Sequence, residues 1–233
     1  HGFVRYVDHF GSDQRIVEAA RISYKSPSKG EEADKKLIGY LYKNKHGSPF
    51  EMAGVTLNIK MPIFVMRQYV RHRIQSLNEV SARYTELPNE FYVPEKWRAQ
   101  DATNKQGSVG AGDIKLPVPW GCLDVDGSSF MSNDPTIVLR GYCDSAYKLY
   151  QQMLQSGIAR EMARMVLPVN IYTEIYALWN LRSLFNFITL REDAHAQAEI
   201  QDYGRAIKSI LVALFPWTME AFEKYKWELK DIE

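Results

Sequence analysis

Cysteine is scarce in this sequence, and its scarcity excludes one class of fold. The 233 residues include two cysteines, Cys122 and Cys143, which are too few for the disulfide framework of a small secreted domain. Long apolar runs are also missing. No segment has the pattern of a signal peptide or the length that crosses a bilayer. We therefore expect a cytoplasmic protein with no membrane association.

The sequence also lacks an excess of either charge. It has 29 basic and 28 acidic residues, which gives a formal net charge of +1. A chain that binds duplex nucleic acid across a broad face carries a clear basic excess. We therefore do not expect a nucleic-acid partner, and any concentration of positive charge must be local.

The patterns that are present predict a single domain over residues 1–233, of the α+β class, mostly helical around a small, largely antiparallel sheet. Apolar residues alternate with polar ones from Val55 to Met61, which predicts a strand with one buried face. A second strand is predicted at 171–178. Residues 99–134 are rich in glycine and weakly periodic, which is typical of an extended loop or insertion. Helices are predicted at 13–24, at 31–46, after Pro62, from Asp134-Pro135 onward, at 160–164, over the stripe from Leu181 to Ile188, and from Arg191 and His195 to about Leu214.

One segment concentrates side chains that bind anions and ring edges. Between Arg71 and Tyr84 the chain reads RHRIQSLNEVSARY. Arginine's planar fork of donors suits phosphate and the carbonyl edge of a pyrimidine. Serine, asparagine and glutamate supply the mixed donors and acceptors that orient a nucleotide or an isoalloxazine ring. The apolar helix predicted after Pro62 would deliver Gln68 and Arg71, three residues apart, to the same pocket.

The order of these residues resembles the signature of the flavin-dependent thymidylate synthase family. That signature, Arg-His-Arg-x-x-Ser-x-Asn-x-x-Ser-x-Arg, matches residues 71–83 at all seven defined positions. Met52 stands where many members of the family have a second histidine. Other segments that resemble the family are Arg21–Tyr24, His46–Glu51, Arg164–Pro168, Trp179–Leu184, Asn186-Phe187 and Leu190 to Gln197.

The resemblance implies an activity that the composition cannot show. The family makes dTMP from dUMP by reductive methylation. Methylenetetrahydrofolate supplies the one-carbon unit, FAD carries the hydride and NADPH reduces the FAD. We therefore expect an enzyme that uses these ligands and, as in the family, forms a homotetramer with shared active sites. Arg71 and Arg83 need not serve the same pocket, because the segment between them could span up to roughly 40 Å.

The resemblance also assigns roles to individual residues. Arg83 and Arg164 are expected at the phosphate, and Arg71 and Arg191 at the pyrimidine, where positive charge stabilises electrons pushed onto the ring oxygens. The expected catalytic residues are Arg191, Arg71 and His46. The expected dUMP ligands are Gln68, Arg71, Glu79, Ser81, Arg83, Arg164 and Arg191. The expected FAD ligands are Ser23, Ser48, Glu51, His72, Arg73, Ile74, Asn78, Glu79, Asn180, Arg182, Asn186 and His195.

Simpler explanations exist for several of these residues. His46 could complement the dipole at the end of a helix. His195 and Glu199 have the spacing of two metal ligands, but the remaining histidines show no ligand spacing, so we expect no metal site. Ser81 lacks the surroundings of a nucleophile, so hydrogen bonding is its expected role. Two other functions remain as alternatives. One is an arginine-rich nucleic-acid binder, and the other is a flavoprotein without a nucleotide substrate.

Overall fold

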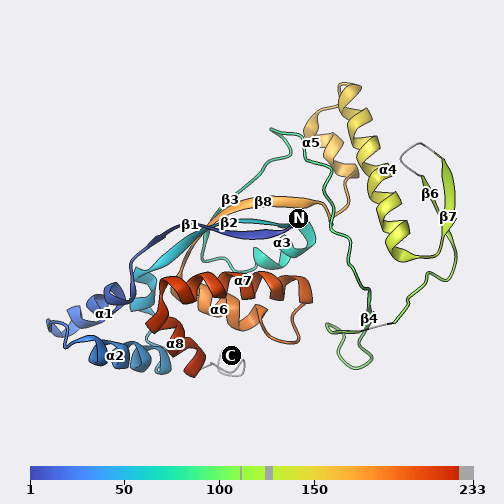
Figure 1. Ribbon diagram of the computed structural model, residues 1–233. Coiled ribbons are helices and arrows are strands. Elements are labelled where there is room, and N and C mark those ends of the chain that lie inside the picture. Colours follow the sequence, from blue (N-terminus) through green and yellow to red (C-terminus); the bar gives the residue numbers. More distant parts are fainter. Residues whose placement is uncertain (111, 124–127, 226–233) are drawn as a thin grey trace. The chain divides into compact units, whose positions relative to one another are not determined.

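The fold was analysed in a computed structural model, which describes residues 1–110, 112–123 and 128–225. The chain divides into two compact units. Figure 1 shows the helices and strands of the chain. The first unit consists of residues 1–2, 60–67 and 79–174, and the second consists of 3–59, 68–78 and 175–233. Helices predominate and the strands form separate small sheets, so the α+β prediction is confirmed.

A four-stranded sheet has the order β1-β2-β8-β3, and most of its residues belong to the second unit. The strands are β1 (Phe3–Phe10), β2 (Gly54–Pro62), β3 (Ser76–Glu79) and β8 (Tyr172–Asn180). Strand β2 follows the predicted alternation, but its polar face is covered as well. Asn58 is 6% exposed and its amide donates to the Ile175 carbonyl at 3.2 Å. A polar side chain can occupy a buried strand because this hydrogen bond replaces its contact with water.

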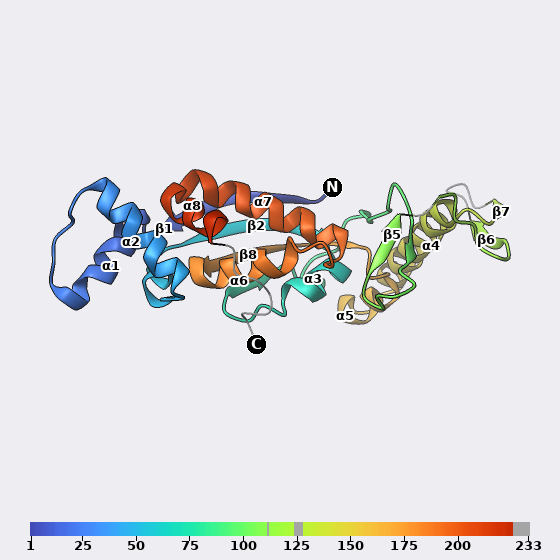
Figure 2. The ribbon, with the colours of Figure 1, turned by 90° about the horizontal axis from the view of Figure 1, so that it is seen from below.

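The other elements of the second unit are helices that cover this sheet and extend from it. They are α1 (Asp13–Arg21), the short η1 (Ile22–Tyr24), α2 (Glu31–Lys43), η2 (Ser48–Met52), α6 (Leu181–Arg191), α7 (Ala198–Leu214) and α8 (Pro216–Lys224). Helix α3 (Ile63–Tyr69) crosses from the first unit into the second. Helices α6 and α7 lie side by side along one face of the sheet (Figures 1 and 2).

The core of the second unit is aromatic. Trp179, on β8, is 1% exposed and its ring nitrogen donates to the Tyr69 hydroxyl at 2.6 Å. Phe187 packs edge-on against Tyr69, with 5.3 Å between ring centroids. Because the indole N–H has a partner, this large ring can be buried without leaving an unsatisfied donor. The cluster fixes the end of α3, from which the signature segment departs.

A buried carboxylate joins α1 to α8. Asp13 is 4% exposed and accepts from the Trp217 and Thr218 amides, at 2.9 and 3.1 Å, and from the Thr218 hydroxyl. Burial raises the pKa of Asp13, and these hydrogen bonds counter that effect. The side chain therefore satisfies amides at the start of α8, which the helix itself cannot satisfy.

The prediction that Arg191 and His195 open one helix is wrong. Arg191 is the last residue of α6, and α7 begins at Ala198. Between the two helices, the Asp193 carboxylate accepts from the His195 amide at 2.8 Å. Such local bonding by an aspartate side chain competes with helical hydrogen bonding, so the chain turns here. His195 and Glu199 consequently do not share a helix face.

The first unit is built on α4 (Pro135–Gln155), whose N-cap is Asp134 as predicted. The short helices α5 (Arg160–Ala163) and η3 (Arg164–Val166) follow it. Ala82, Leu87 and Ile171 form a small core beside them. Within the predicted insertion, β4 (Arg98–Gln100) pairs with β5 (Ser108–Gly110) and β6 (Trp120–Leu123) pairs with β7 (Ser129–Ser132), both antiparallel. Residues 111 and 124–127 of that segment lie outside the described residues.

Candidate functional site

The signature segment turns sharply after α3 and continues into β3. The Gln75 side chain donates to the His72 carbonyl at 2.7 Å and closes this turn. Arg71 and Arg73 are exposed, whereas His72 between them is 8% exposed and points into the second unit. The alternation follows from the turn, because the middle residue packs on the aromatic core while its neighbours face solvent.

His72 and Arg191 are hydrogen-bonded in the second unit, although they lie 119 positions apart in sequence. The Arg191 Nε–H donates to His72 Nε2 at 2.9 Å. Burial and the nearby Arg191 charge lower the pKa of His72 to about 4, so the ring is neutral at physiological pH. Burial also lowers the pKa of Arg191, but a guanidinium stays charged at any physiological pH.

A second contact joins the same two regions. The Gln68 side chain, from α3, donates to the Gln197 side-chain oxygen just before α7. Gln68, Arg191 and His72 therefore belong to one cluster in the second unit. Gln197 was not among the predicted site residues. Gln197 is the last residue of the segment from Leu190 to Gln197 that resembles the family. That resemblance is the sequence signal that could have identified it.

Two of the segments expected to bind FAD, His46–Glu51 and Trp179–Leu184, also meet. Arg182, at the start of α6, forms an ion pair with Glu51 of η2. Its side chain lies directly over Gly47, because a Cβ on that glycine would come within 2.6 Å of Arg182 Nε. The Asn180 side chain accepts from the Ser183 amide at 2.9 Å and caps α6. A residue larger than glycine at position 47 would push Arg182 out of this arrangement.

The expected FAD ligands fit a dinucleotide in their chemistry. All except Glu79 lie in the second unit. Arg182 is 57% exposed in its side chain, so its cationic end remains accessible to a diphosphate. Ile74 is 72% exposed and could cover part of an apolar ring. Exposed members of this set are Ser23, Ser48, Arg73, Ile74, Asn78, Glu79, Arg182, Asn186 and His195. We therefore find the residues compatible with FAD.

His46 lies just beyond the end of α2, as the simpler explanation requires. Its amide donates to the Leu41 carbonyl at 2.9 Å, and Lys45 before it has a φ of +58°. The His46 ring is exposed and stacks on Tyr40, with 5.9 Å between centroids. The geometry gives His46 a role at the helix end. Its predicted catalytic role stays a prediction.

In the first unit, the two arginines expected at the phosphate converge on Glu161. The Arg83 Nε lies 3.3 Å from the Glu161 carboxylate, and the Arg164 Nε–H donates to the Glu161 backbone carbonyl, also at 3.3 Å. Ser81 accepts from the Arg83 amide at 3.3 Å through its hydroxyl. Arg83 and Arg164, which lie far apart in sequence, therefore both contact Glu161, one at its carboxylate and the other at its backbone carbonyl. Glu161 was missed because nothing in its sequence surroundings marks it as a partner of Arg83.

Glu79, the remaining dUMP candidate of the first unit, has a buried partner on β8. The Thr173 hydroxyl is 2.6 Å from the Glu79 carboxylate, and Thr173 is 4% exposed. The Val80 amide donates to the Glu174 carbonyl at 2.9 Å next to this pair. Thr173 was also missed, because its position within an apolar strand gives no sign of this hydrogen bond.

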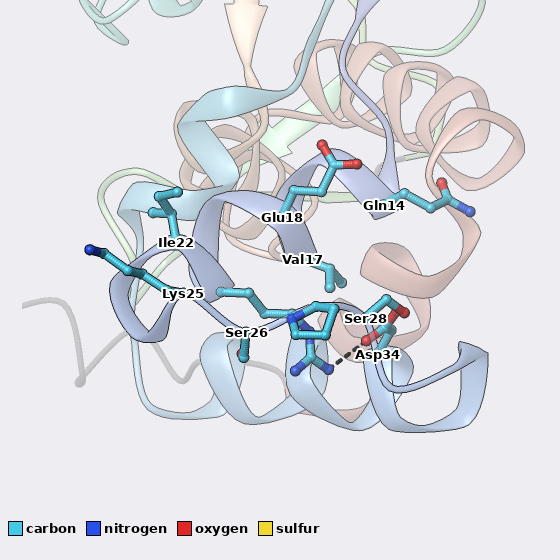
Figure 3. A pocket seen from close by; sticks show the side chains of 10 residues that line it. Gln14, Val17, Glu18, Ile22, Lys25, Ser26, Ser28 and Asp34 are labelled. Carbon is cyan, nitrogen blue, oxygen red and sulfur yellow. Dashed lines mark hydrogen bonds and ion pairs between the residues drawn. The ribbon is translucent and has the colours of Figure 1, made fainter.

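A pocket of about 370 Å³ lies beside α1 and is lined by Gln14, Glu18, Arg21, Lys25 and Asp34, among others (Figure 3). Inside it, Arg21 donates to Asp34 at 2.6 Å, and Ser28 donates to the other oxygen of the same carboxylate at 2.5 Å. Arg21 and Asp34 of this pocket are thus paired with each other. Ser23, an expected FAD ligand, lies two residues after Arg21 and is exposed.

Comparison with known proteins agrees with the signature. The family model for thymidylate synthase complementing protein, Thy1, matches residues 5–217. A flavin-dependent thymidylate synthase of Thermosipho africanus is 44% identical over 227 residues, which cover 97% of this chain and 93% of that protein. The chain belongs to the flavin-dependent thymidylate synthase family. A relative from Thermus thermophilus with the same description is also 44% identical, and the match covers 97% of this chain and 77% of that protein.

The chain is also similar to solved structures. The UMP/dUMP methylase PolB of Streptomyces cacaoi, bound with 5-Br UMP, has a TM-score of 0.78 and 34% identity. The match covers 97% of this chain and 95% of that chain. A second PolB structure, bound with 5-Br dUMP, has a TM-score of 0.77 and 33% identity. The family resemblance seen in the sequence is therefore confirmed.

Two further findings concern the part of the chain that the structure describes. No helix there is long and apolar enough to span a membrane. No group of three or more histidine, cysteine, aspartate or glutamate side chains in those residues could hold a metal ion.

Proposed function

We propose that this chain is a flavin-dependent thymidylate synthase that methylates dUMP to dTMP, with methylenetetrahydrofolate as the one-carbon donor and NADPH as the reductant. When bound, FAD supplies the hydride. The observation that carries the proposal is the convergence of Arg83 and Arg164 on Glu161. Two guanidinium groups at one small site match a phosphate monoester, whose oxygens accept charge-assisted hydrogen bonds.

The chain's own residues would divide the work on dUMP. Arg83 and Arg164 bind the phosphate, with Ser81 supporting the turn before Arg83. Arg71, Arg191 and Gln68 meet the pyrimidine, where the two positive charges stabilise electrons pushed onto the ring oxygens. Glu79, fixed by Thr173, accepts from the nucleotide. His46 lies near the reacting centre and positions folate or flavin.

The phosphate assignment is tested by removing each guanidinium in turn. Arg83→Ala and Arg164→Ala should each weaken dUMP binding by about one to two decades, while FAD stays bound. Arg140→Ala, on α4, is a matched control with an arginine outside the proposed site. UMP, the other nucleotide in the description of PolB, should be compared with dUMP as a substrate. Unchanged dUMP affinity in both Arg83→Ala and Arg164→Ala would remove them from the site.

FAD would be held by other predicted residues, including Arg73, Arg182 and Asn78. The purified protein should have the absorption spectrum of a flavoprotein, and dUMP should perturb it. Arg73→Ala and His195→Ala should each lower the bound FAD measured after gel filtration. If both variants retain FAD as wild type does, these two residues do not bind the cofactor.

We further propose that all 233 residues act as one catalytic domain, with an insertion at 99–134, and that the protein works in the cytoplasm as a homotetramer with shared active sites. Exposed apolar side chains support the assembly. On β8, Tyr176 is 53% and Leu178 is 40% exposed, and all four residues of β3 are exposed. A sheet face of this kind indicates a partner surface, and a second copy of the chain would cover it.

Complementation tests the shared site. Arg71→Ala and Arg83→Ala should each be nearly inactive. After joint unfolding and refolding, mixed oligomers should regain activity, because some pockets receive both arginines from different chains. Light scattering should give the mass of four chains. A monomer in solution, or mixed oligomers with no more activity than the separate variants, contradicts the proposal.

A further inference from the structure

His72 differs from its signature neighbours in what its side chain can do. The ring packs against Phe187, at 4.9 Å between centroids, and against Trp179, at 6.4 Å. A guanidinium has donors and no acceptor. His72 Nε2 must therefore accept the hydrogen bond from Arg191 with its lone pair, and the ring carries its proton on Nδ1. A ring in this state brings no positive charge to a diphosphate.

Arg191 is held at two points. At its backbone, α6 ends against Gly204 of α7, where a Cβ would lie 3.7 Å from the Arg191 carbonyl carbon. At its side chain, only Nε takes part in the bond to His72. The two terminal guanidinium nitrogens, Nη1 and Nη2, take no part in this bond. That pair is the part of the fork that suits the edge of a pyrimidine.

The hydrogen-bond partner of each arginine determines whether its positive charge is offset. Arg182 pairs with Glu51 and Arg21 pairs with Asp34, so a carboxylate offsets each of these guanidinium groups. Arg191 is oriented by a neutral acceptor instead. An uncompensated positive charge in a half-buried position acts more strongly on a developing negative charge than one that is already paired.

We propose that His72 is a positioning residue for Arg191: its neutral Nε2 fixes the guanidinium toward the pyrimidine of the bound uridylate while leaving its charge intact. His72 then contributes to nucleotide binding and turnover through Arg191, rather than as a charged ligand of FAD. The inference rests on the proposed function for the role of Arg191. The hydrogen bond itself does not depend on it.

Two substitutions separate the acceptor from the shape of the ring. In His72→Gln, the side-chain oxygen reaches about as far as Nε2 and can accept from Arg191. In His72→Leu, the volume is largely kept and the acceptor is lost. In FAD-loaded protein, His72→Leu should lower kcat/KM for dUMP by about ten- to a hundredfold, and His72→Gln should restore most of it. FAD content should stay at the wild-type level in both. His9→Gln, on β1, controls for loss of a histidine elsewhere.

Nitrogen NMR of the histidine ring supplies a readout without turnover. In wild-type protein, His72 Nε2 should give the signal of an unprotonated acceptor, and Arg191→Lys, which removes Nε, should shift it. A protonated Nε2 overturns the inference. So does equal kcat/KM in the Gln and Leu variants, or loss of FAD with unchanged dUMP binding. If wild type neither binds nor methylates dUMP, the proposed function fails, and the NMR result still decides the His72–Arg191 bond.

Discussion

Glu161 should compete with the nucleotide phosphate for Arg83, so replacing Glu161 should strengthen dUMP binding. Its carboxylate lies 3.3 Å from Arg83 Nε. A phosphate that takes this guanidinium must displace the carboxylate and accept a negative neighbour. Glu161→Gln removes both penalties and keeps the side-chain length. The direction is informative because most substitutions near a binding site weaken the ligand.

The expected gain is small, because the pair is exposed. The Arg83 and Glu161 side chains are 55% and 56% exposed. Exposed ion pairs are worth about 0.2–1 kcal/mol, which corresponds to at most about a fivefold tighter dissociation constant for dUMP. The gain should shrink as salt is raised, since surface charges are screened.

Calorimetric titration of FAD-loaded protein with dUMP, at low and at physiological ionic strength, measures this effect. Glu86→Gln is the matched control, because Glu86 faces Arg160 at 3.8 Å in a similarly exposed pair outside the proposed site. The control should bind dUMP as wild type does. If Glu161→Gln binds dUMP more weakly, Glu161 holds Arg83 in its productive position and the reasoning from competition is wrong.

Three further predictions concern thiols, acid stability and an indirect contact. The double variant Cys122→Ser/Cys143→Ser should keep its methylating activity, and complete inactivity in a folded, FAD-loaded double variant would refute a mechanism without an enzyme thiolate. The depressed pKa of His72 should make the free energy of unfolding fall as pH drops from about 6.5 to about 4, by at most about 3 kcal/mol, because the unfolded chain binds this proton first. Denaturant titrations should show a flatter pH profile in His72→Gln. Thr173→Val should weaken dUMP binding about three- to tenfold by releasing Glu79, with Thr173→Ser near wild type, and equal affinities in the two would exclude this route.

The sequence predicted elements whose signals are local. Three predicted features depend only on neighbouring residues: the N-cap at Asp134, the alternation through β2 and the start of a helix after Pro62. The structure contains all three. The end of α6 at Arg191 was missed, because the turn depends on an Asp193 side chain that also fits a helix. Local pattern cannot distinguish these outcomes.

Contacts between side chains that lie far apart in sequence could not be predicted from local pattern. The family resemblance pointed to Arg83 and Arg191 as site residues, but their contacts come from α5 and from the signature turn. Whether His72 carries a charge depends on the burial of its ring and on Arg191 beside it. Neither is visible until the chain is folded, and the predicted role of His72 as an FAD ligand came from the family resemblance alone.

The hydrogen bonds that join Asp13 of α1 to the start of α8 also have a consequence for folding during translation. Asp13 leaves the ribosome early, but its hydrogen-bond donors Trp217 and Thr218 lie more than 200 positions later. Until they emerge, the carboxylate must remain in water or lie buried without its native donors. The second unit therefore cannot complete its native hydrogen bonds before the start of α8 has been translated. This step of folding waits for α8, and a ribosome that stalls before α8 would leave an N-terminal helix without its anchor.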